Sequence, residues 1–268
     1  MKVSIITVVY NNRSTIRQAM ESVLSQDYQD LEYILVDGAS TDGTAEEIRR
    51  CMSDHPDRTF KFVSEPDNGI YDAMNKGIRM ATGDIVGILN SDDFYVNNQV
   101  VSTVVKTLRK TGADSFYADI VVVKSDNVDK VIRYFSGGSF RPSRFAYGWM
   151  PPHPTMFIRR KCYAQYGLYK TDYEIAADFE LVVRFFLKYG VTYTYFPQVM
   201  VKMRQGGVST RNIRSNWILS KETVRACLEN GVRTNIAKVL SKYFLKIWQY
   251  VERPAQVSSG PGRGGFSG

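Results

Sequence analysis

At 268 residues the chain can form one domain with a sizeable core, and its formal charge of +8 favours anionic partners such as phosphates, nucleic acid or an anionic membrane surface. Three widely separated cysteines give no ligand spacing and favour a reduced, cytoplasmic setting over a disulfide scaffold. No apolar run approaches the roughly 20 residues of a membrane-spanning helix, and the first residues lack the cleavage site of a signal peptide.

The first hundred residues alternate strand and helix four times. Apolar, β-branched runs predict strands over Val3–Val9, Glu32–Val36, Phe60–Val63 and Asp84–Leu89. Between them, apolar residues recur at i, i+3, i+4 and i+7, as in the stripe Ile16, Ala19, Met20, Val23 and Leu24. Thr44 and Glu47 have the spacing of a capping box at the second helix. This alternation predicts a doubly wound, Rossmann-like half.

The second half of the chain is less regular. Its pattern predicts a helix over Val100–Lys110, an edge strand over Ser115–Val123 and a hairpin or loop over Lys124–Phe140. A short strand is expected over Thr155–Arg159 and a helix over Ala176–Tyr189. A strand over Val191–Phe196 and a helical segment over residues 212–251 are expected to follow. The Gly-, Ser- and Pro-rich residues 253–268 are expected to be disordered.

Acidic residues follow three of the four predicted strands. Asp37 ends the second strand, Asp67 follows the third, and Asp92 and Asp93 follow the fourth. Because parallel strands bring such ends to one rim, where open α/β sheets bind ligands, these carboxylates indicate a metal-diphosphate site. Turn residues and helix caps are the alternative explanation for each of them. The chain carries no Gly-x-Gly-x-x-Gly after the first strand and no P-loop, which disfavours dinucleotide cofactors and P-loop chemistry.

Six ordered segments together resemble family 2 glycosyltransferases, and the resemblance covers roughly residues 1–210. They are Val3–Asn11, Leu35–Thr44, Asp67–Gly77, Thr82–Asp93, His153–Arg160 and Ile175–Leu181. The resemblance implies a GT-A fold, in which a mixed, mostly parallel α/β sheet is flanked by helices. It also implies a nucleotide-sugar donor and transfer with inversion at the anomeric carbon.

The same resemblance assigns the donor site. Val8 and Tyr10 would line the nucleoside pocket, and Asp37 would bind the base, most often uracil, so that a UDP-linked donor is expected. Asp67 opens the third matching segment and would join the same rim.

Asp92 and Asp93 match the family's Asp-x-Asp element, here written Ser-Asp-Asp with Ser91 in place of the first aspartate. Asp93 would then be the ligand of a divalent metal, Mn²⁺ or Mg²⁺, and Asp92 a ribose or diphosphate contact.

Asp178 matches the general base that deprotonates the acceptor hydroxyl. Inverting transfer needs one carboxylate opposite the leaving diphosphate, whereas a retaining hydrolase needs two that flank one bond. At the start of a predicted helix the dipole favours the ionised carboxylate. An ordinary N-cap aspartate is the alternative, and Glu180 is a rival base.

Two further residues complete the expected site. His153, held between prolines, matches a family position near the donor phosphates or the acceptor, although a structural histidine bonded to the backbone is the commoner outcome. Arg204 precedes Gly206 and Gly207, and this segment offers a cation and free backbone N–H groups to phosphate, or forms a plain turn.

These features divide the chain into a GT-A domain over residues 1–210, a helical extension over 211–252 and the tail. Within the domain, residues 1–98 would bind the nucleotide-sugar, and residues 99–210 would bind the acceptor and carry the base. In the extension, Lys238, Lys242 and Lys246 recur every four residues beside apolar and aromatic residues. Such a helix lies on an anionic membrane surface, packs on its own domain or forms a homodimer.

We therefore expect a metal-dependent, inverting glycosyltransferase at the cytoplasmic face of the plasma membrane. It would transfer sugar to a saccharide or lipid-linked acceptor in bacterial polysaccharide or glycolipid synthesis. A catalytically silent nucleotide-sugar-binding protein remains open because of Ser91, and a sugar-phosphate nucleotidyltransferase is disfavoured because no glycine-rich, basic signature follows the first strand. Nucleic acid is not an expected partner, since the cations are dispersed and no nucleic-acid motif is present.

Overall fold

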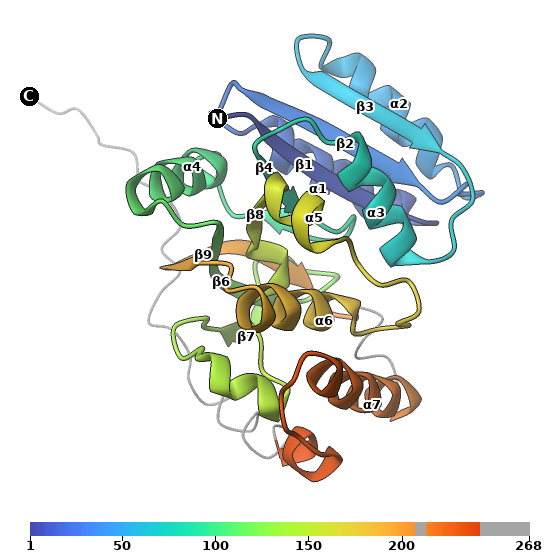
Figure 1. Cartoon of the computed structure of the whole chain (residues 1–268). Coiled ribbons are helices and arrows are strands. Elements are labelled where there is room, and N and C mark those ends of the chain that lie inside the picture. The colour runs from blue at the N-terminus through green and yellow to red at the C-terminus, as the bar shows by residue number, and fades with distance from the viewer. Residues whose placement is uncertain (207–212, 242–268) are drawn as a thin grey trace, which may run out of the picture.

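The computed structural model describes residues 1–206 and 213–241 (Figure 1). In this part of the chain nine strands form one sheet in the order β3-β2-β1-β4-β8-β6-β9-β5, with β7 paired to β6. The parallel strands β1 (Val3–Val9), β2 (Leu31–Asp37), β3 (Thr59–Ser64) and β4 (Ile85–Ile88) make up the amino-terminal half. The predicted mixed, mostly parallel α/β sheet is confirmed.

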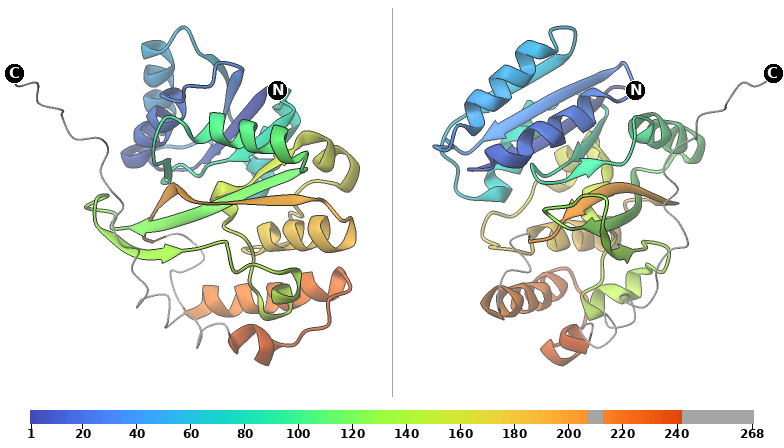
Figure 2. Two further views of the ribbon diagram at one scale, coloured as in Figure 1. Left: turned by 90° about the vertical axis from the view of Figure 1, so that its left-hand side faces the viewer. Right: turned by 180° about the vertical axis from the view of Figure 1, so that it is seen from behind.

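Helices cover both faces of the sheet (Figure 2). On one face α1 (Arg13–Leu24), α2 (Thr44–Asp54) and α4 (Val100–Thr111) pack against Val3, Ile5 and Val9 of β1. On the other face α3 (Ile70–Met80) and later helices pack against Ile6 and Val8. Successive side chains of β1 thus enter opposite cores, which explains why the strand is apolar at every position.

The strand register places the polar loops at one edge. Val9 at the end of β1 pairs with Asp37 at the end of β2, and Asp37 pairs with Ser64 at the end of β3. The loops that follow these strands therefore emerge side by side, as predicted for parallel strands.

The carboxyl-terminal half continues the same sheet in mixed directions. It contains β5 (Phe94–Tyr95), β6 (Ser115–Val123), β7 (Val131–Phe135), β8 (Phe157–Arg159) and β9 (Tyr193–Arg204). The hairpin expected after Val123 is confirmed, since β7 runs antiparallel to β6. The prediction of an edge position for Ser115–Val123 is wrong, because β6 lies between β8 and β9. Eight of its nine residues are buried, as a central strand requires.

Shorter helical segments connect these strands. They are the 3₁₀ turns η1 (Pro142–Tyr147) and η2 (His153–Thr155), the helix α5 (Arg160–Tyr166), the helix α6 (Ala177–Val183) and the π-helical turn η3 (Arg184–Lys188). The helix predicted over Ala176–Tyr189 therefore exists, but its last turn is wider than an α-helix.

The predicted capping box at α2 is wrong. The residue before the helix is Gly43, with φ 90°, and no side chain caps the helix from that position. Thr44 Oγ1 instead donates to Asp42 Oδ1 (2.5 Å), and Glu47 pairs with Arg17 and Arg50. Both side chains that the spacing assigned to the cap therefore have other partners.

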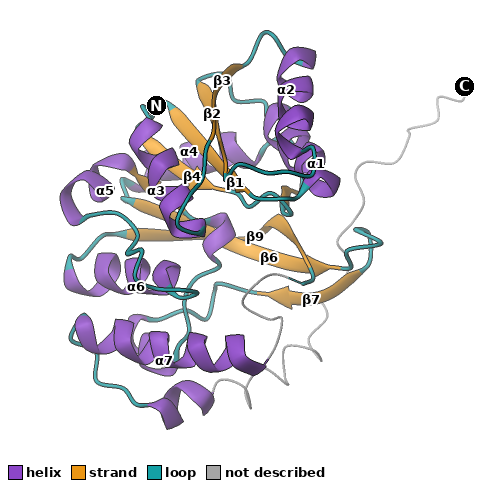
Figure 3. Ribbon diagram, turned by 90° about the vertical axis from the view of Figure 1, so that its right-hand side faces the viewer, coloured by secondary structure: helices purple, strands orange, loops and turns teal. Residues whose placement is uncertain are grey.

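The last described helices lie on the far side of α6 from the sheet (Figure 3). Helix α7 (Ile213–Glu229) packs against α6. The chain then turns at Gly231, with φ 78°, before residues 236–241 become helical again, so the described part of the helical segment predicted over residues 212–251 consists of two helices. Lys242, Lys246 and the tail predicted to be disordered lie outside the described residues. No helix in residues 1–206 and 213–241 is both long and apolar enough to cross a membrane.

Candidate functional site

Asp37 is fully buried at the end of β2. Its side chain is 0% exposed. Oδ1 accepts a hydrogen bond from Ser40 Oγ (2.5 Å), and Oδ2 accepts from Ser64 Oγ (2.6 Å) and from the Ser40 backbone N–H (3.1 Å). The carboxylate thus ties the loop after β2 to the end of β3, and its hydrogen-bonding capacity is largely used within the chain.

The next residue, Gly38, lies beneath a second carboxylate. A Cβ at Gly38 would come within 2.6 Å of Asp67 Oδ2 and 3.3 Å of Tyr10 Cδ2. Asp67 is partly exposed, and Tyr10, at the start of the loop after β1, is 65% exposed. Val8 is only 5% exposed and belongs to the core below. Asp67 and Tyr10 therefore border one solvent-facing surface, whereas Val8 is buried in the core.

The Ser91-Asp92-Asp93 segment follows β4 (Ile85–Ile88) at the same edge. The Asp93 N–H donates to the Asn90 carbonyl (3.1 Å), which closes a turn. The start of α1 fixes this turn, because the Asn12 amide donates to Ser91 Oγ (2.9 Å) and Thr15 Oγ1 donates to the Ser91 carbonyl (2.8 Å).

The two carboxylates of this segment differ in exposure. Asp92 is partly exposed, and no described side chain hydrogen-bonds to its carboxylate, whereas Asp93 is 2% exposed and accepts from the Arg204 N–H (3.3 Å). Burial raises the pKa of Asp93 well above its usual range, and the charge of Asp92 raises it further. Two acidic groups held this close, one of them buried, favour a cation between or beside them.

Arg204 reaches this segment from β9. Its Nη1 donates to the Asp92 carbonyl (2.6 Å), its Nη2 donates to Gln18, and its guanidinium lies 5.1 Å from the centre of the Phe94 ring. The predicted cation is therefore present at the site, where it supports the backbone of the aspartate pair.

The donor atoms around Asp93 suit a hard divalent cation. Asn90 Oδ1 is buried and has no hydrogen-bond partner among the described residues, while its Nδ2 donates to Asp93 Oδ2 (3.4 Å). The available ligands are thus oxygens from Asn90, Asp92 and Asp93, which is the donor set that Mg²⁺ and Mn²⁺ prefer. The residues present fit the metal that the sequence predicts.

Asp178 lies in the first turn of α6. The residue at the N-cap is Ala176, so Asp178 is not the ordinary N-cap that was the alternative. Its Oδ1 accepts the Phe179 N–H (2.7 Å). Burial raises the pKa of Asp178, and the nearby His153 opposes this shift. The carboxylate is therefore a stronger base than an exposed aspartate.

His153 accompanies Asp178. Its Nε2 lies 2.8 Å from the Tyr169 hydroxyl, and burial lowers the pKa of His153. The imidazole is accordingly neutral at pH 7 and is held by a side chain, whereas the structural alternative expected a backbone partner.

Strand pairing brings His153 and Asp178 to the edge of the sheet at which Asp37 and the Asp92–Asp93 pair lie. Strand β8 runs antiparallel to β4 with Gly87 opposite Phe157, so His153, just before β8, lies at the carboxyl end of β4. From α3, the Tyr71 hydroxyl donates to the Ile175 carbonyl, and its ring stacks on Tyr169 at 5.8 Å. Asp178 and the aspartate pair thus lie at the same edge of the sheet.

Glu180, the rival base, is not available. It is 0% exposed and accepts from Arg184 at 3.1 Å through both carboxylate oxygens. Lys170 Nζ and the Asn230 amide lie 3.2 Å from its Oε1. Because two cations neutralise this carboxylate inside the fold and an amide also binds it, Asp178 is the one of these two acids that remains free to exchange a proton.

A clamp on the segment before Asp178 had no signal in the sequence. Glu222 of α7 accepts the backbone N–H groups of Glu174 (2.7 Å), Ile175 (2.9 Å) and Ala176 (2.9 Å). Farther along α7, Arg225 pairs with Asp172, while Glu229 binds Lys170 (2.7 Å) and accepts from the Tyr173 hydroxyl (2.9 Å). We call residues 168–176 the base loop, and Glu222, Arg225 and Glu229 the α7 clamp.

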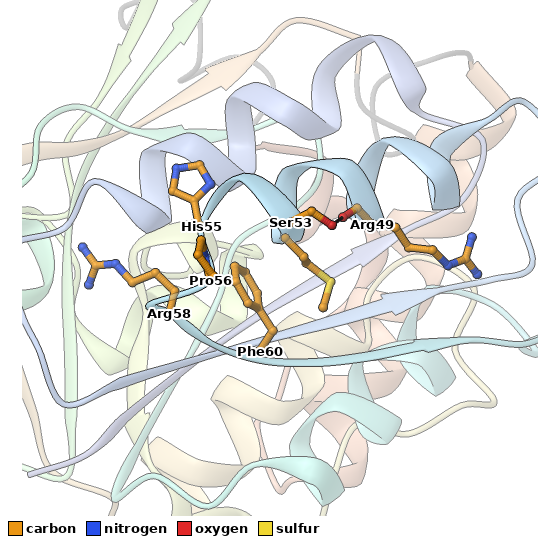
Figure 4. A pocket seen from close by; sticks show the side chains of 7 residues that line it. Arg49, Ser53, His55, Pro56, Arg58 and Phe60 are labelled. Atoms are coloured by element: carbon orange, nitrogen blue, oxygen red, sulfur yellow. Dashed lines mark hydrogen bonds between the residues drawn. The ribbon is translucent and has the colours of Figure 1, made fainter.

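A surface hollow elsewhere does not contribute to this edge (Figure 4). It is lined by Arg49, Ser53, His55, Pro56, Arg58 and Phe60, near the start of β3 and hence at the opposite end of the sheet from Asp37. Its two arginines point away in opposite directions, so they do not converge on an anion. Nearby, Glu21, Cys51 and His55 bring ligand atoms within 4.8 Å of one another, which sequence spacing did not reveal, but Glu21 already pairs with Arg17.

Known proteins resemble this chain in sequence and in fold. A PGL/p-HBAD biosynthesis glycosyltransferase of Mycobacterium bovis is 28% identical over 224 residues, covering 83% of this chain and 82% of that protein. The fold matches S. aureus TarS with a TM-score of 0.65 at 17% identity, over 91% of this chain and 43% of TarS. It also matches the mannosyltransferase PcManGT of Pyrobaculum calidifontis, solved with GDP-Man and Mn²⁺, with a TM-score of 0.60 at 20% identity over 93% and 82% of the two chains. The profile of Glycosyl transferase family 2 matches residues 4–167, and the chain belongs to that family.

Proposed function

We propose that the protein transfers a sugar from a UDP-linked donor to a hydroxyl of a saccharide or lipid-linked acceptor, with inversion at the anomeric carbon. The observation that carries this proposal is the arrangement of Asp178 and the Asp92–Asp93 pair at one edge of the sheet. Family membership supplies the reaction class, and a TarS fragment that shares the fold was solved with UDP-GlcNAc (TM-score 0.64, 17% identity). The M. bovis relative, named for PGL/p-HBAD biosynthesis, supports a glycolipid acceptor.

The donor diphosphate would lie against Asn90, Asp92 and Asp93. A divalent cation held by these oxygens would offset the charge that the leaving diphosphate develops. Arg204 keeps the turn in place through the Asp92 carbonyl and adds positive charge beside it. Manganese is present in the PcManGT structure, which supports the same type of ion here.

Asp178 would act on the opposite side of the sugar. Its carboxylate accepts the proton of the acceptor hydroxyl while the oxygen bonds to the anomeric carbon. The bond from that carbon to the diphosphate oxygen breaks, and its electron pair leaves with the nucleoside diphosphate. His153, which is neutral and hydrogen-bonded to Tyr169, would help to position the acceptor beside Asp178. Asp37 is not required to touch the donor, because its role in the fold is to hold the loop that carries Gly38.

A charge of +8 also suits an anionic membrane surface, at which a lipid-linked acceptor is presented. We therefore place the reaction at the inner face of the plasma membrane.

The test is a donor screen with the full chain, in which UDP- and GDP-sugars are supplied with Mn²⁺ or with a chelator. Release of the nucleoside diphosphate and product formation on a lipid-linked acceptor are measured together. We expect metal-dependent release from a UDP-sugar that increases when acceptor is added. Nucleotide binding without turnover on any donor would favour the silent binding protein instead.

A further inference from the structure

A second group of metal-ligating side chains lies where α1 and α2 end, at the opposite end of the sheet from Asp37. Glu21 in the last turn of α1, Cys51 in the last turn of α2 and His55 directly after α2 each bring one ligand atom within 4.8 Å of the others. Glu21 Oε2 lies 3.5 Å from His55 Nε2, and Glu21 Oε1 lies 4.0 Å from Cys51 Sγ. A tetrahedral zinc ion with bonds of about 2.0–2.3 Å separates its ligand atoms by about 3.4–3.6 Å, so small movements of these side chains would complete such a site.

The His55 ring is held in the orientation that a metal ligand needs. Its Nδ1 lies 3.0 Å from the Cys51 carbonyl, which can only accept a hydrogen bond, so Nδ1 carries a hydrogen and the neutral ring has its lone pair on Nε2. In metal sites, the same bond from the second ring nitrogen to a backbone carbonyl fixes the tautomer and the direction of a ligating histidine. The ring points away from Phe60 (Figure 4), and both His55 and Glu21 are partly exposed, so a water molecule can supply the remaining ligand.

The charges around this group favour a cation. Both helices end here, and neither carries a basic residue in its last turn to offset the negative end of its dipole. Arg17, from the middle of α1, lies 3.5 Å from Glu21 Oε1. Its contacts with Asp54 (2.7 Å) and Glu47 (3.0 Å) are shorter, so Glu21 is the most distant of these three partners. The Glu21 oxygen that faces His55 therefore stays available to a metal ion.

An ion pair between a protonated His55 and Glu21 is the alternative explanation for this arrangement. It would account for the 3.5 Å contact but would give no role to the Cys51 thiol, which is 0% exposed and faces Glu21. A thiolate, an imidazole and a carboxylate together suit a borderline-soft ion such as Zn²⁺, whereas the oxygen ligands at the aspartate pair after β4 suit Mg²⁺ or Mn²⁺. The two sites therefore select different metals.

We propose that Glu21, Cys51 and His55 form a zinc-binding site that joins the end of α1 to the end of α2. On binding, the Cys51 thiol releases its proton to solvent, and the ion is coordinated by the thiolate, His55 Nε2, a Glu21 oxygen and one water molecule. The ion links two helices that pack on the same face of the sheet. It acts on the stability of the amino-terminal half and takes no part in sugar transfer.

Cobalt titration of the full chain, freed of metal by a chelator and kept reduced by a phosphine, tests this site. Co²⁺ substitutes for Zn²⁺ and gives a near-ultraviolet charge-transfer band when it is bonded to a thiolate, a signal to which the oxygen ligands at the aspartate pair do not contribute. The wild type should develop this band with a single Co²⁺ per chain, and Zn²⁺ should abolish the band by displacing the cobalt. The competition measures the affinity for Zn²⁺.

Four variants and controls assign the ligands. Cys51→Ser should abolish the band, whereas Cys162→Ser, which removes another buried thiol, should leave it unchanged. His55→Asn retains a donor for the Cys51 carbonyl and should lower Zn²⁺ affinity by at least about tenfold. Glu21→Gln should also lower it, and Glu46→Gln, which removes the same charge from the exposed first turn of α2, should not. Thermal melting checks that each variant is folded.

Absence of a thiolate band in the wild type would overturn the inference in favour of the ion pair between His55 and Glu21. A band that persists in folded Cys51→Ser would overturn it as well, because the metal would then be bound to another cysteine. Should Cys51→Ser fail to fold, wild-type Zn²⁺ affinity in His55→Asn and Glu21→Gln would overturn it, and the expected loss in both would support it. None of these measurements depends on sugar transfer, so each outcome leaves the proposed function untouched.

Discussion

The donor edge and the base loop are built in different ways. At the donor edge, neighbouring strands place Tyr10, Gly38 and the Asp92–Asp93 pair next to one another, and contacts between successive loops fix them. The base loop instead depends on α7, whose clamp residues lie 46–59 residues farther along the chain than their partners. The family profile ends at residue 167, before both the base loop and α7.

This difference separates two properties of the enzyme. Because α7 packs mainly on α6 and η1 in the described part of the chain, changes in the clamp should alter catalysis while nucleotide affinity is preserved. Changes at the aspartate pair should alter both, since the same residues bind the diphosphate and assist its departure. The following variants test that separation.

The largest effect is expected for Asp178→Asn. Loss of the general base should lower kcat by about 10²–10⁴-fold, while the affinity for UDP with Mn²⁺ stays within twofold of wild type. Steady-state transfer and calorimetry measure the two quantities. Glu180→Gln is a poor control, because its carboxylate lies in a buried ion pair with Arg184 and the variant is expected to melt earlier. Turnover near the wild-type rate would assign the base to another residue.

Asp93→Asn should weaken donor binding and catalysis together. Removing one charged oxygen from the set Asn90, Asp92 and Asp93 should lower Mn²⁺-dependent UDP affinity by at least about tenfold and kcat by more. Titration of UDP at fixed Mn²⁺, and of Mn²⁺ at fixed UDP, measures the coupling between the two ligands. Equal UDP affinity with Mn²⁺ and with a chelator, in the wild type, would contradict the metal assignment.

Glu222→Gln is expected to have a smaller effect, confined to catalysis. The neutral amide accepts hydrogen bonds from the N–H groups of residues 174–176 less strongly, so the base loop should sample other positions and kcat should fall about tenfold. UDP affinity should not change. Glu174→Gln is the matched control, since Glu174 is exposed in the same loop and its side chain makes no hydrogen bond or ion pair in the described residues. A parallel loss of UDP affinity in Glu222→Gln would show that the clamp and the donor edge are not separate.

Much of this arrangement could be predicted from the sequence because strand-helix alternation fixes where strand ends meet. The aspartates after β4 were identified for that reason, together with the motif resemblance, whereas the choice of Asp178 rested on the resemblance. The accessibility of Asp37 could not be predicted, since it depends on Ser40 and on Ser64, which comes from another strand. The central position of β6 was missed because an apolar run does not tell which strands will lie on either side of it.

The α7 clamp illustrates a second limit. A glutamate within an amphipathic helix is usually solvated, and nothing near Glu222 in the sequence indicates that it meets three backbone N–H groups of a distant loop. Charge partners such as Arg225 and Asp172 are likewise determined by how α7 packs on α6. Only the tertiary structure reveals such contacts.

The smallest expected effect is on stability, and it follows from the raised pKa of Asp178. Between the ordinary aspartate pKa of about 3.9 and its raised value in the fold, the native state binds more protons than the unfolded state, so this group lowers stability as pH rises. At pH 7 the ionised carboxylate therefore destabilises the fold, and Asp178→Asn should melt about 1–3 °C higher than the wild type.

The difference should disappear below about pH 4, where the wild-type carboxyl is protonated in both states. The lowered pKa of His153 destabilises both proteins as pH falls below about 6.5, so comparing them at each pH largely cancels its contribution. A variant that melts lower than the wild type at pH 7 would mean that the Asp178 carboxylate stabilises the start of α6 by more than its burial costs.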